Sequence, residues 1–276
     1  TVPAKWFALK ERATMVGLIT LANLVGTGIG MVATPVLAEN NVPISTIQFI
    51  YGGITAFSAV LFILLSRETP PSPPDTAGGE VRALMLDGLK NALTIKSFWI
   101  YLLITFIGFG IFNGITTWIE AMIKPKGFSP TDAGTLGALM LVGGLLGSVI
   151  LPSISDKLGK RKIFLQLGIL LSIPGLLGMA YLHSLIFLFA AAFILGFFLI
   201  SLGPIGMQYS AEITFPTPEG TSNGLIQLFG QISVVFVYVM EALRTPEGSF
   251  TPSLLLMAGL LGIGLLLSIQ MKESIK

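Results

Sequence analysis

Cysteine is absent from this 276-residue sequence, and histidine occurs once, at position 183. Without cysteine the chain can form no disulfide, no thiolate nucleophile and no thiolate metal site. Charged residues are also scarce, at 11% of the chain, whereas soluble domains carry about 25%. Most of the chain therefore cannot face water. No cluster of histidines and carboxylates suggests a metal site, so we expect no metal and no cofactor.

What the sequence has instead is a series of long apolar runs, each near the roughly 20 residues that a helix needs to cross a membrane. Lipid offers no water to the backbone, so each run should form a helix. A barrel would show strictly alternating strands, a pattern that is missing here. We expect an all-α membrane protein with eight spans, at approximately 13–37, 44–66, 98–119, 133–155, 163–182, 184–206, 222–243 and 253–270.

The basic residues are distributed unevenly between the two sets of loops. One set, together with the chain ends, carries thirteen of the 16 Lys and Arg residues, and the other carries only Lys124, Lys126 and Arg244. Because basic loops face the cytoplasm, we place both chain ends and segment 67–97 there, and we expect a multi-pass protein of the cell membrane. The net charge of +2 is then a signal of topology, and no nucleic-acid partner is expected.

One long loop divides the chain. Its first half, SRETPPSPPDTAGG, is rich in proline and glycine and predicts an extended linker. Its second half, EVRALMLDGLKNALTIK, places apolar residues at helical spacing between charges and predicts a short helix on the membrane surface. We therefore expect two helices in 1–66, the linker and surface helix in 67–97, and six helices in 98–276.

Two stretches of the sequence resemble each other. WFALKERATMVGLITLANL at 6–24 and TFPTPEGTSNGLIQLFGQI at 214–232 both place Glu four residues after a Phe and then continue through Gly-Leu-Ile-x-Leu. Both would start on the cytoplasmic side. Parallel copies of this kind are expected when two halves are related by an axis along the membrane normal.

The loop between the fourth and fifth spans reads SISDKLGKRK, and its core from Asp156 to Lys162 resembles the D-R-x-G-R-[RK] signature of the major facilitator superfamily. That resemblance implies twelve helices in two six-helix halves joined by a long cytoplasmic linker. On this scheme the eight spans look like helices five to twelve. The expected partners are a small-molecule solute, the lipid bilayer and the four missing N-terminal helices, and we expect a monomer.

Three further segments resemble the feline leukaemia virus subgroup C receptor-related family: AEITFPTPEGTSNGL (211–225), FSPTDAG (128–134) and FNGITTWIEAMI (112–123). That branch includes transporters linked to choline, haem and vitamin-like solutes. The resemblance implies a secondary carrier that moves a small organic solute by alternating access. The alternative is a receptor or sensor on the same fold, which binds the solute without moving it.

Polar residues spaced by three, four or seven positions share one face of a helix, and three spans carry such a stripe. Stripes of this kind either bond one helix to another or line a solute site near the midplane. Hydrogen bonding between helices is favoured for the span with Thr20, Asn23 and Thr27, and solute contact for the span with Asn223, Gln227, Gln231 and Tyr238. The candidate substrate-binding residues are Asn113, Thr117, Gln227, Gln231 and Asn23.

The family resemblance bears on individual residues. Gln231 falls where choline-handling relatives have a solute-contacting glutamine, but Leu24 and Asn113 fall where they have a glutamine and a tyrosine. Because a cage for a quaternary ammonium needs aromatic faces, these two differences count against choline.

Glu120 lies at the outer end of its span, in line with Asn113 and Thr117. As a hypothesis, it is a proton or cation site that couples solute movement to an ion gradient. The alternative is a carboxylate that simply extends to the membrane surface.

The Asp156 loop also has a mechanical interpretation. Asp156 can pair with Arg12 at the start of the first span, while Glu212 and Glu219 can pair with Lys160 or Arg161. Such a cluster would hold the cytoplasmic gate shut in one state. A solvated basic loop that only sets topology is the alternative.

Two local patterns are structural. Ser129-Pro130-Thr131-Asp132 predicts a helix start capped by Ser129. Gly143 and Gly147 predict the close approach of another helix.

The stretch from Gly220 to Gly224 matches the GxSxG pattern of serine hydrolases. Ser222 would need a base, but the topology puts His183 across the membrane, about 30 Å away. We therefore expect no enzymatic activity.

Overall fold

The computed structural model describes residues 9–67 and 85–274, and throughout these residues the regular elements are helices. The chain forms two compact units, Thr1–Val81 and Arg82–Lys276. In the described part, seven helices are long and apolar enough to cross a membrane, and the remaining expected span includes the apolar helical stretch Val25–Glu39. The prediction of an all-α membrane protein is confirmed.

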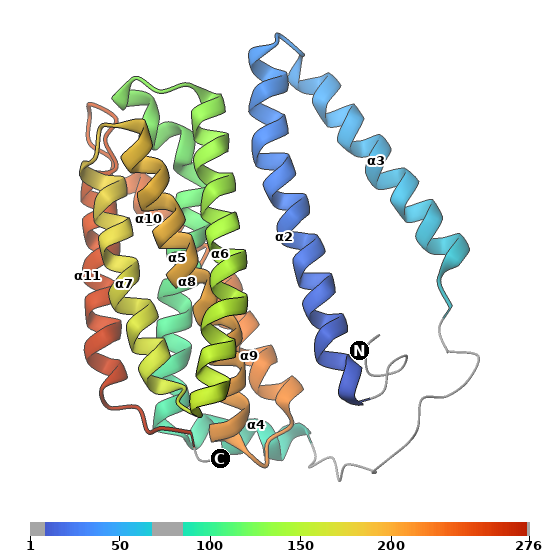
Figure 1. Cartoon of the computed structure of the whole chain (residues 1–276), viewed down its shortest axis with the longest axis vertical. Helices are drawn as coiled ribbons and strands as arrows, with labels where there is room; N and C mark the ends of the chain where they lie inside the picture. Colours follow the sequence, from blue (N-terminus) through green and yellow to red (C-terminus); the bar gives the residue numbers. More distant parts are fainter. Residues whose placement is uncertain (1–8, 68–84, 275–276) are drawn as a thin grey trace. The chain divides into compact units, whose positions relative to one another are not determined.

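The first unit is a helical hairpin of α2 (Leu9–Glu39) and α3 (Ile44–Leu65) (Figure 1). The turn between them uses Asn41 with a positive φ of 60°, a conformation that asparagine tolerates better than most residues. A hydrogen bond of 2.8 Å between the hydroxyls of Thr34 and Tyr51 links the two helices. Within this unit almost all of α3 is exposed and apolar, as expected of a surface that faces lipid or another helix.

The second unit begins with α4 (Met85–Thr94), which is followed by a bundle that crosses the membrane six times. Consecutive crossings run in opposite directions (Figure 1). The bundle contains α5 (Lys96–Ile123), the short η1 (Lys124–Lys126), α6 (Pro130–Leu158), α7 (Lys162–Tyr181), α8 (Leu185–Thr214), α9 (Glu219–Ile232), α10 (Val235–Ala242) and α11 (Thr251–Ser268).

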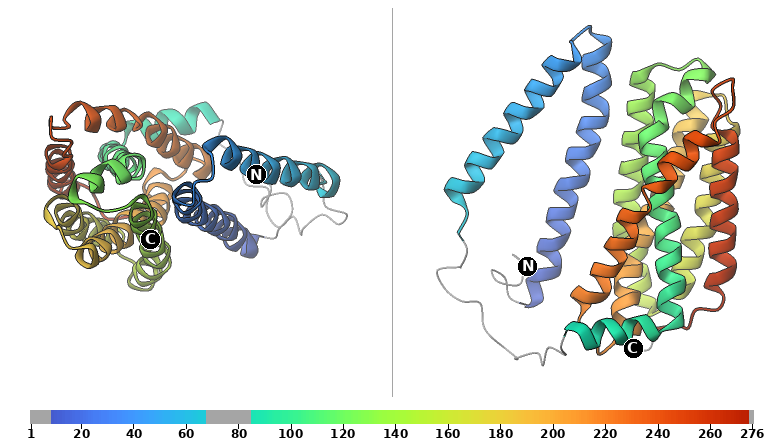
Figure 2. Two further views of the ribbon diagram at one scale, coloured as in Figure 1. Left: turned by 90° about the horizontal axis from the view of Figure 1, so that it is seen from above. Right: turned by 180° about the vertical axis from the view of Figure 1, so that it is seen from behind.

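This bundle has two distinct ends. We call the end that carries α4 and residues 159–161, 215–218 and 269–274 the linker end, and the end that carries η1 and residues 182–184 and 243–250 the far end. Figure 2 shows α4 lying across the linker end. The Asn91 side chain in α4 donates to the carbonyl of Thr214 at 3.1 Å and to the hydroxyl of Thr217 at 3.0 Å. This helix is thereby fixed to the loop between α8 and α9.

Helix α5 is the most buried crossing of the second unit. It packs against α6, α8, α9, α10 and α11. Its isoleucines at 104, 107, 111 and 115 are buried and follow the helical repeat. The position of α5 matters for function because its less buried face carries the polar stripe from Asn113 to Glu120.

Helix α7 is capped at both ends by residues distant in the sequence. At its C-terminal end the ammonium of Lys126 donates to the carbonyls of Met179, Ala180 and Leu182 at 2.8, 3.3 and 2.9 Å. At its N-terminal end the Glu273 carboxylate accepts the backbone N–H groups of Arg161 and Lys162 at 2.8 and 2.9 Å. These bonds satisfy backbone groups that a helix cannot pair internally.

The two local predictions for α6 are confirmed. The Ser129 hydroxyl accepts the Asp132 N–H at 3.1 Å, and the Asp132 carboxylate accepts the Ser129 N–H at 2.9 Å, which is a capping box. Further along α6, a methyl group added to Gly143 or Gly147 would overlap a backbone carbonyl oxygen of α8, that of Phe193 or Phe197. The two helices therefore touch backbone to backbone.

This contact makes Gly147 a sensitive position. In Gly147→Ala the new methyl group meets the backbone of Phe197, which cannot rotate away, so we expect a loss of about 1–3 kcal/mol in the free energy of unfolding. Gly262→Ala in α11 is the matched control, because that site has open space. Thermal unfolding in detergent measures both; equal melting temperatures would contradict the close packing of α6 on α8.

Candidate functional site

The helix of the seventh predicted span tightens near its middle. The sequence predicts one span over 222–243, and the structure has one apolar helical span over Glu219–Ala242, in which a tightened turn joins the end of α9 at Ile232 to the start of α10 at Val235. The Ser233 hydroxyl donates to the Gly230 carbonyl at 2.5 Å. The N–H groups of Phe236 and Val237 bond to carbonyls three residues back, at 3.0 Å each. Tightening of this kind, with a serine bonded to its own helix, often bends a helix.

This tightened turn lies against the polar stripe of α5. The Asn113 amide donates to the Ser233 hydroxyl at 3.4 Å. Gln231 precedes Ser233 by two residues, and Gln227 lies one turn earlier on α9; both glutamines are exposed within the unit, and Asn113 is half-buried. We call Asn113, Gln227, Gln231 and Ser233 the polar break. Two candidate residues from α9 and one from α5 thus occur beside this tightened turn.

The remaining residues of the stripes have different surroundings. Thr117 and Glu120 are exposed and continue along α5 toward the far end. The amide oxygen of Asn223 accepts the Ser210 hydroxyl at 3.2 Å and therefore joins α8 to α9. In the first unit the Thr27 hydroxyl donates to the Asn23 carbonyl of its own helix at 2.9 Å. The Asn23 side chain is exposed within that unit.

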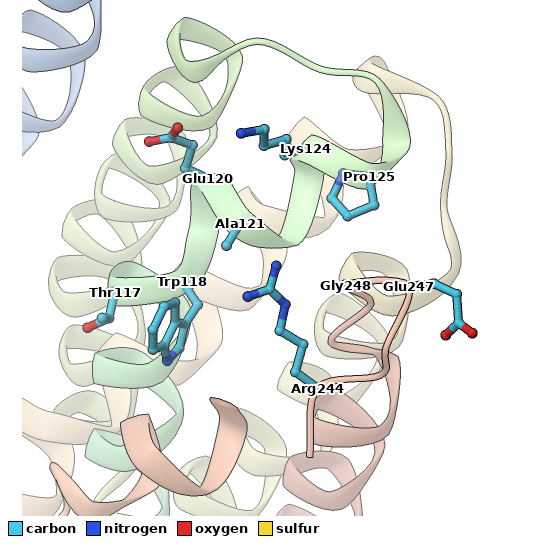
Figure 3. Close-up of a pocket in the computed structure, with 9 residues that line it drawn as sticks. All are labelled: Thr117, Trp118, Glu120, Ala121, Lys124, Pro125, Arg244, Glu247 and Gly248. Carbon is cyan, nitrogen blue, oxygen red and sulfur yellow. The ribbon is translucent and has the colours of Figure 1, made fainter. Parts of the chain in front are cut away.

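A pocket opens at the far end of the second unit, with a volume of about 510 Å³ (Figure 3). Its walls come from the end of α5, from η1 and from the loop after α10. The lining residues are Thr117, Trp118, Glu120, Ala121, Lys124, Pro125, Arg244, Glu247 and Gly248. Three of these residues were not among the candidate site residues: Trp118, Lys124 and Arg244. Two of them, Lys124 and Arg244, are among the three basic residues in the set of loops that otherwise lacks Lys and Arg.

At the linker end, the predicted gate residues form an ion-pair network around Arg161. This side chain is only 6% exposed and pairs with Asp156 at the end of α6. Its guanidinium also donates to one Glu212 oxygen on α8 at 3.2 and 3.3 Å and to the Ser155 hydroxyl at 3.2 Å. Burial opposes the charge of Arg161, but the hydrogen bonds and charges of Glu212 and Asp156 outweigh it and raise the pKa of Arg161.

The other gate candidates are not part of this network in the described residues. Lys160 and Glu219 are exposed, and Glu219 lies in the first turn of α9, where a carboxylate favours the helix dipole. The side chain of Arg12 lies outside the part of the molecule that the structure describes, so its pairing with Asp156 stays a prediction. The Gln208 amide, which was not predicted, donates to Glu212 at 3.0 Å.

The serine of the GxSxG pattern has a structural role. Ser222 is buried in the first turns of α9, and its hydroxyl donates to the Glu219 carbonyl at 3.1 Å. A nucleophilic serine would be exposed on a turn between a strand and a helix. Among the described residues there is also no group of three or more His, Asp or Glu side chains able to hold a metal.

Comparison with known proteins gives a consistent family. The model of the Major Facilitator Superfamily matches residues 1–236 and 121–273. An uncharacterized protein of Archaeoglobus fulgidus is 36% identical over 234 residues, which cover 81% of this chain and 99% of that protein. The solute carrier family 49 member A3 of Danio rerio is 30% identical over 255 residues, covering 90% of this chain and 54% of the relative.

A third relative belongs by its name to the family that the sequence motifs resemble. The choline/ethanolamine transporter flvcr2b of Danio rerio is 28% identical over 294 residues, which cover 100% of this chain and 60% of that protein. The predicted resemblance to the feline leukaemia virus receptor-related transporters is therefore confirmed. The chain spans little more than half the length of these two zebrafish relatives. With its apolar helices and these matches, the chain is a multi-pass membrane protein that belongs to the Major Facilitator Superfamily.

Proposed function

We propose that this chain is part of a secondary carrier that moves a small organic solute across a membrane by alternating access. The observation that carries the proposal is the polar break, where Asn113 bonds to Ser233 at the tightened turn between α9 and α10. In carriers of this kind the solute site lies near the bilayer midplane, where polar side chains on otherwise apolar helices mark it. The exposed glutamines beside the turn supply more such side chains.

The chemistry of the polar break favours a solute with several hydrogen-bonding groups. Its side chains are amides and a hydroxyl, which donate and accept but carry no charge. The names of the relatives point to choline and ethanolamine as solutes of those proteins. For this chain, a site built from Asn113, Gln227 and Gln231 suits a solute with amine, hydroxyl or carbonyl groups better than a quaternary ammonium, which an aromatic cage would select.

We further propose that the Asn23 side chain, which is exposed on α2 within the first unit, contacts the solute. We also propose that the network around Arg161 acts as a latch at the linker end. Two carboxylates share one buried guanidinium there, so the Asp156 carboxylate, which is 61% exposed, stays accessible to a second cation in one state of the carrier.

The role of Gln231 can be tested by uptake. Gln231→Ala removes a polar group from the polar break, and we expect uptake to fall about tenfold, the effect of losing one hydrogen bond to a polar solute. The measurement is solute uptake by proteoliposomes that contain the full-length protein, with a panel of labelled metabolites that includes choline and ethanolamine. Binding without uptake in the unaltered protein would instead identify a receptor or sensor.

A matched control is Gln166→Ala. Gln166 lies on α7, whose main contacts are with α8 and α11. Uptake should persist in this variant. If both variants, or neither, lose uptake, the polar break is not the solute site.

Glu120 is proposed as the ion-coupling residue. It is exposed in the far-end pocket, and Figure 3 shows its carboxylate projecting from the end of α5. If proton binding at Glu120 couples transport, Glu120→Gln should abolish the dependence of uptake on a pH gradient while leaving solute exchange intact. Glu247→Gln is the control, since Glu247 lines the same pocket but points away from it. An unchanged pH dependence in Glu120→Gln would reject the coupling role.

The latch can be tested by distance measurements between spin labels, because the chain has no cysteine to remove. Asp156→Asn takes one carboxylate from Arg161, and we expect it to shift the distribution of distances between labels at positions 40 and 183 toward one state. Asp87→Asn, an exposed carboxylate on α4, serves as the control. Identical distributions in all three proteins would show that the network is structural and not a latch.

A further inference from the structure

The pocket at the far end is more than a gap between loops, because its walls are held in place by packed aromatic rings. Phe250 is buried, with 2% of its surface exposed. The Trp118 ring stacks on it with centroids 5.7 Å apart and an angle of 28°. The Trp118 N–H donates to the Val237 carbonyl at 2.9 Å. An indole fixed by both contacts forms one wall of the pocket.

The same phenylalanine also positions Arg244. The guanidinium carbon of Arg244 lies 5.4 Å from the centre of the Phe250 ring, a cation–π distance. One terminal nitrogen donates to Glu241 at 3.3 Å. An arginine has five N–H donors, and the side chain is 37% exposed, so donors remain for a ligand. In Figure 3 the guanidinium points into the pocket, between Trp118 and η1.

Lys124 and Glu120 are on the opposite wall. They are one helical turn apart at the end of α5 and both are exposed. Figure 3 shows the Lys124 side chain extending over the pocket toward Glu120. The Glu247 side chain points away from the pocket. Its pKa is lowered by hydrogen bonds from its own backbone and from Thr245, so its carboxylate bonds within its own loop.

The balance of these charges indicates the class of ligand. The charged residues that line the pocket are the cations Lys124 and Arg244 and the carboxylates Glu120 and Glu247. The full charges sum to zero, so neither a plain anion nor a plain cation is favoured by the pocket as a whole. A molecule with both charges can place each against its opposite. The volume of about 510 Å³ falls in the ordinary range for small-ligand sites.

We propose that this pocket binds a small zwitterion, with its carboxylate or phosphate at Arg244 and Lys124, its amine at Glu120 and its apolar part against Trp118. The ligand is either a free solute, such as an amino acid, or the headgroup of an amino phospholipid. This site is separate from the polar break; it shares Glu120 with the proposed ion-coupling role, so its binding is measured without transport.

The test uses the full chain in detergent and the fluorescence of Trp118, after Trp6→Phe and Trp99→Phe remove the other two tryptophans of the sequence. The probes are leucine, its analogue without the amine (4-methylpentanoate), its analogue without the carboxylate (3-methylbutylamine), and glycerophosphoethanolamine. A zwitterion should bind about tenfold more tightly than either analogue, because each lost ion pair in a partly closed site costs about that factor. Binding of leucine indicates a free solute; binding of glycerophosphoethanolamine alone indicates a lipid headgroup.

Single substitutions identify the side chains that hold the zwitterion. Arg244→Gln and Lys124→Gln should each weaken zwitterion binding about tenfold, and Glu247→Gln should leave it unchanged. Gln231→Ala should also leave it unchanged, so this result stands whether or not the polar break is a solute site. Arg244→Lys, which keeps the charge, and thermal unfolding of each variant exclude a folding defect. The proposal is overturned if neither zwitterion binds, if an analogue binds equally well, or if Glu247→Gln has the same effect as Arg244→Gln.

Discussion

The first amides and last carbonyls of a helix have no partner within the helix, and a hydrocarbon environment supplies none. In the second unit, side chains from distant segments form hydrogen bonds with such unpaired backbone groups. Lys126 bonds to carbonyls 53 to 56 residues away at one end of α7. Glu273 bonds to amides 111 and 112 residues away at its other end. Each bond therefore also fixes the place of one segment against another.

The same constraint explains the form of the polar break. Polar groups inside a membrane need partners within the protein. Ser233 bonds back to Gly230 and accepts the Asn113 amide of α5. One turn further, the Trp118 N–H bonds to the Val237 carbonyl. Helix α5 therefore contacts the tightened turn and the start of α10 at two points.

Local patterns were sufficient to predict what depends on neighbouring residues. The apolar runs predicted the spans, Ser129 with Asp132 predicted the start of α6, and Gly143 with Gly147 predicted a close helix contact. The caps of α7 could not be predicted, because Lys126 and Glu273 are remote in sequence from the ends they satisfy. The tightened turn at Ser233 was missed for a related reason: a serine in an apolar run is compatible with a regular helix, and only its contact with Asn113 distinguishes this one.

The positions of the three basic residues at the far end follow from helix electrostatics as well as topology. The C-terminal end of a helix carries a partial negative charge of about one half, and Lys124 and Lys126 follow the end of α5 while Arg244 follows the end of α10. The ammonium of Lys126 donates to a carbonyl at the end of α7. The other two line one pocket because α5 and α10 end side by side, joined by Phe250 between Trp118 and Arg244. The far-end pocket therefore gathers Lys124 and Arg244 where two helices end side by side.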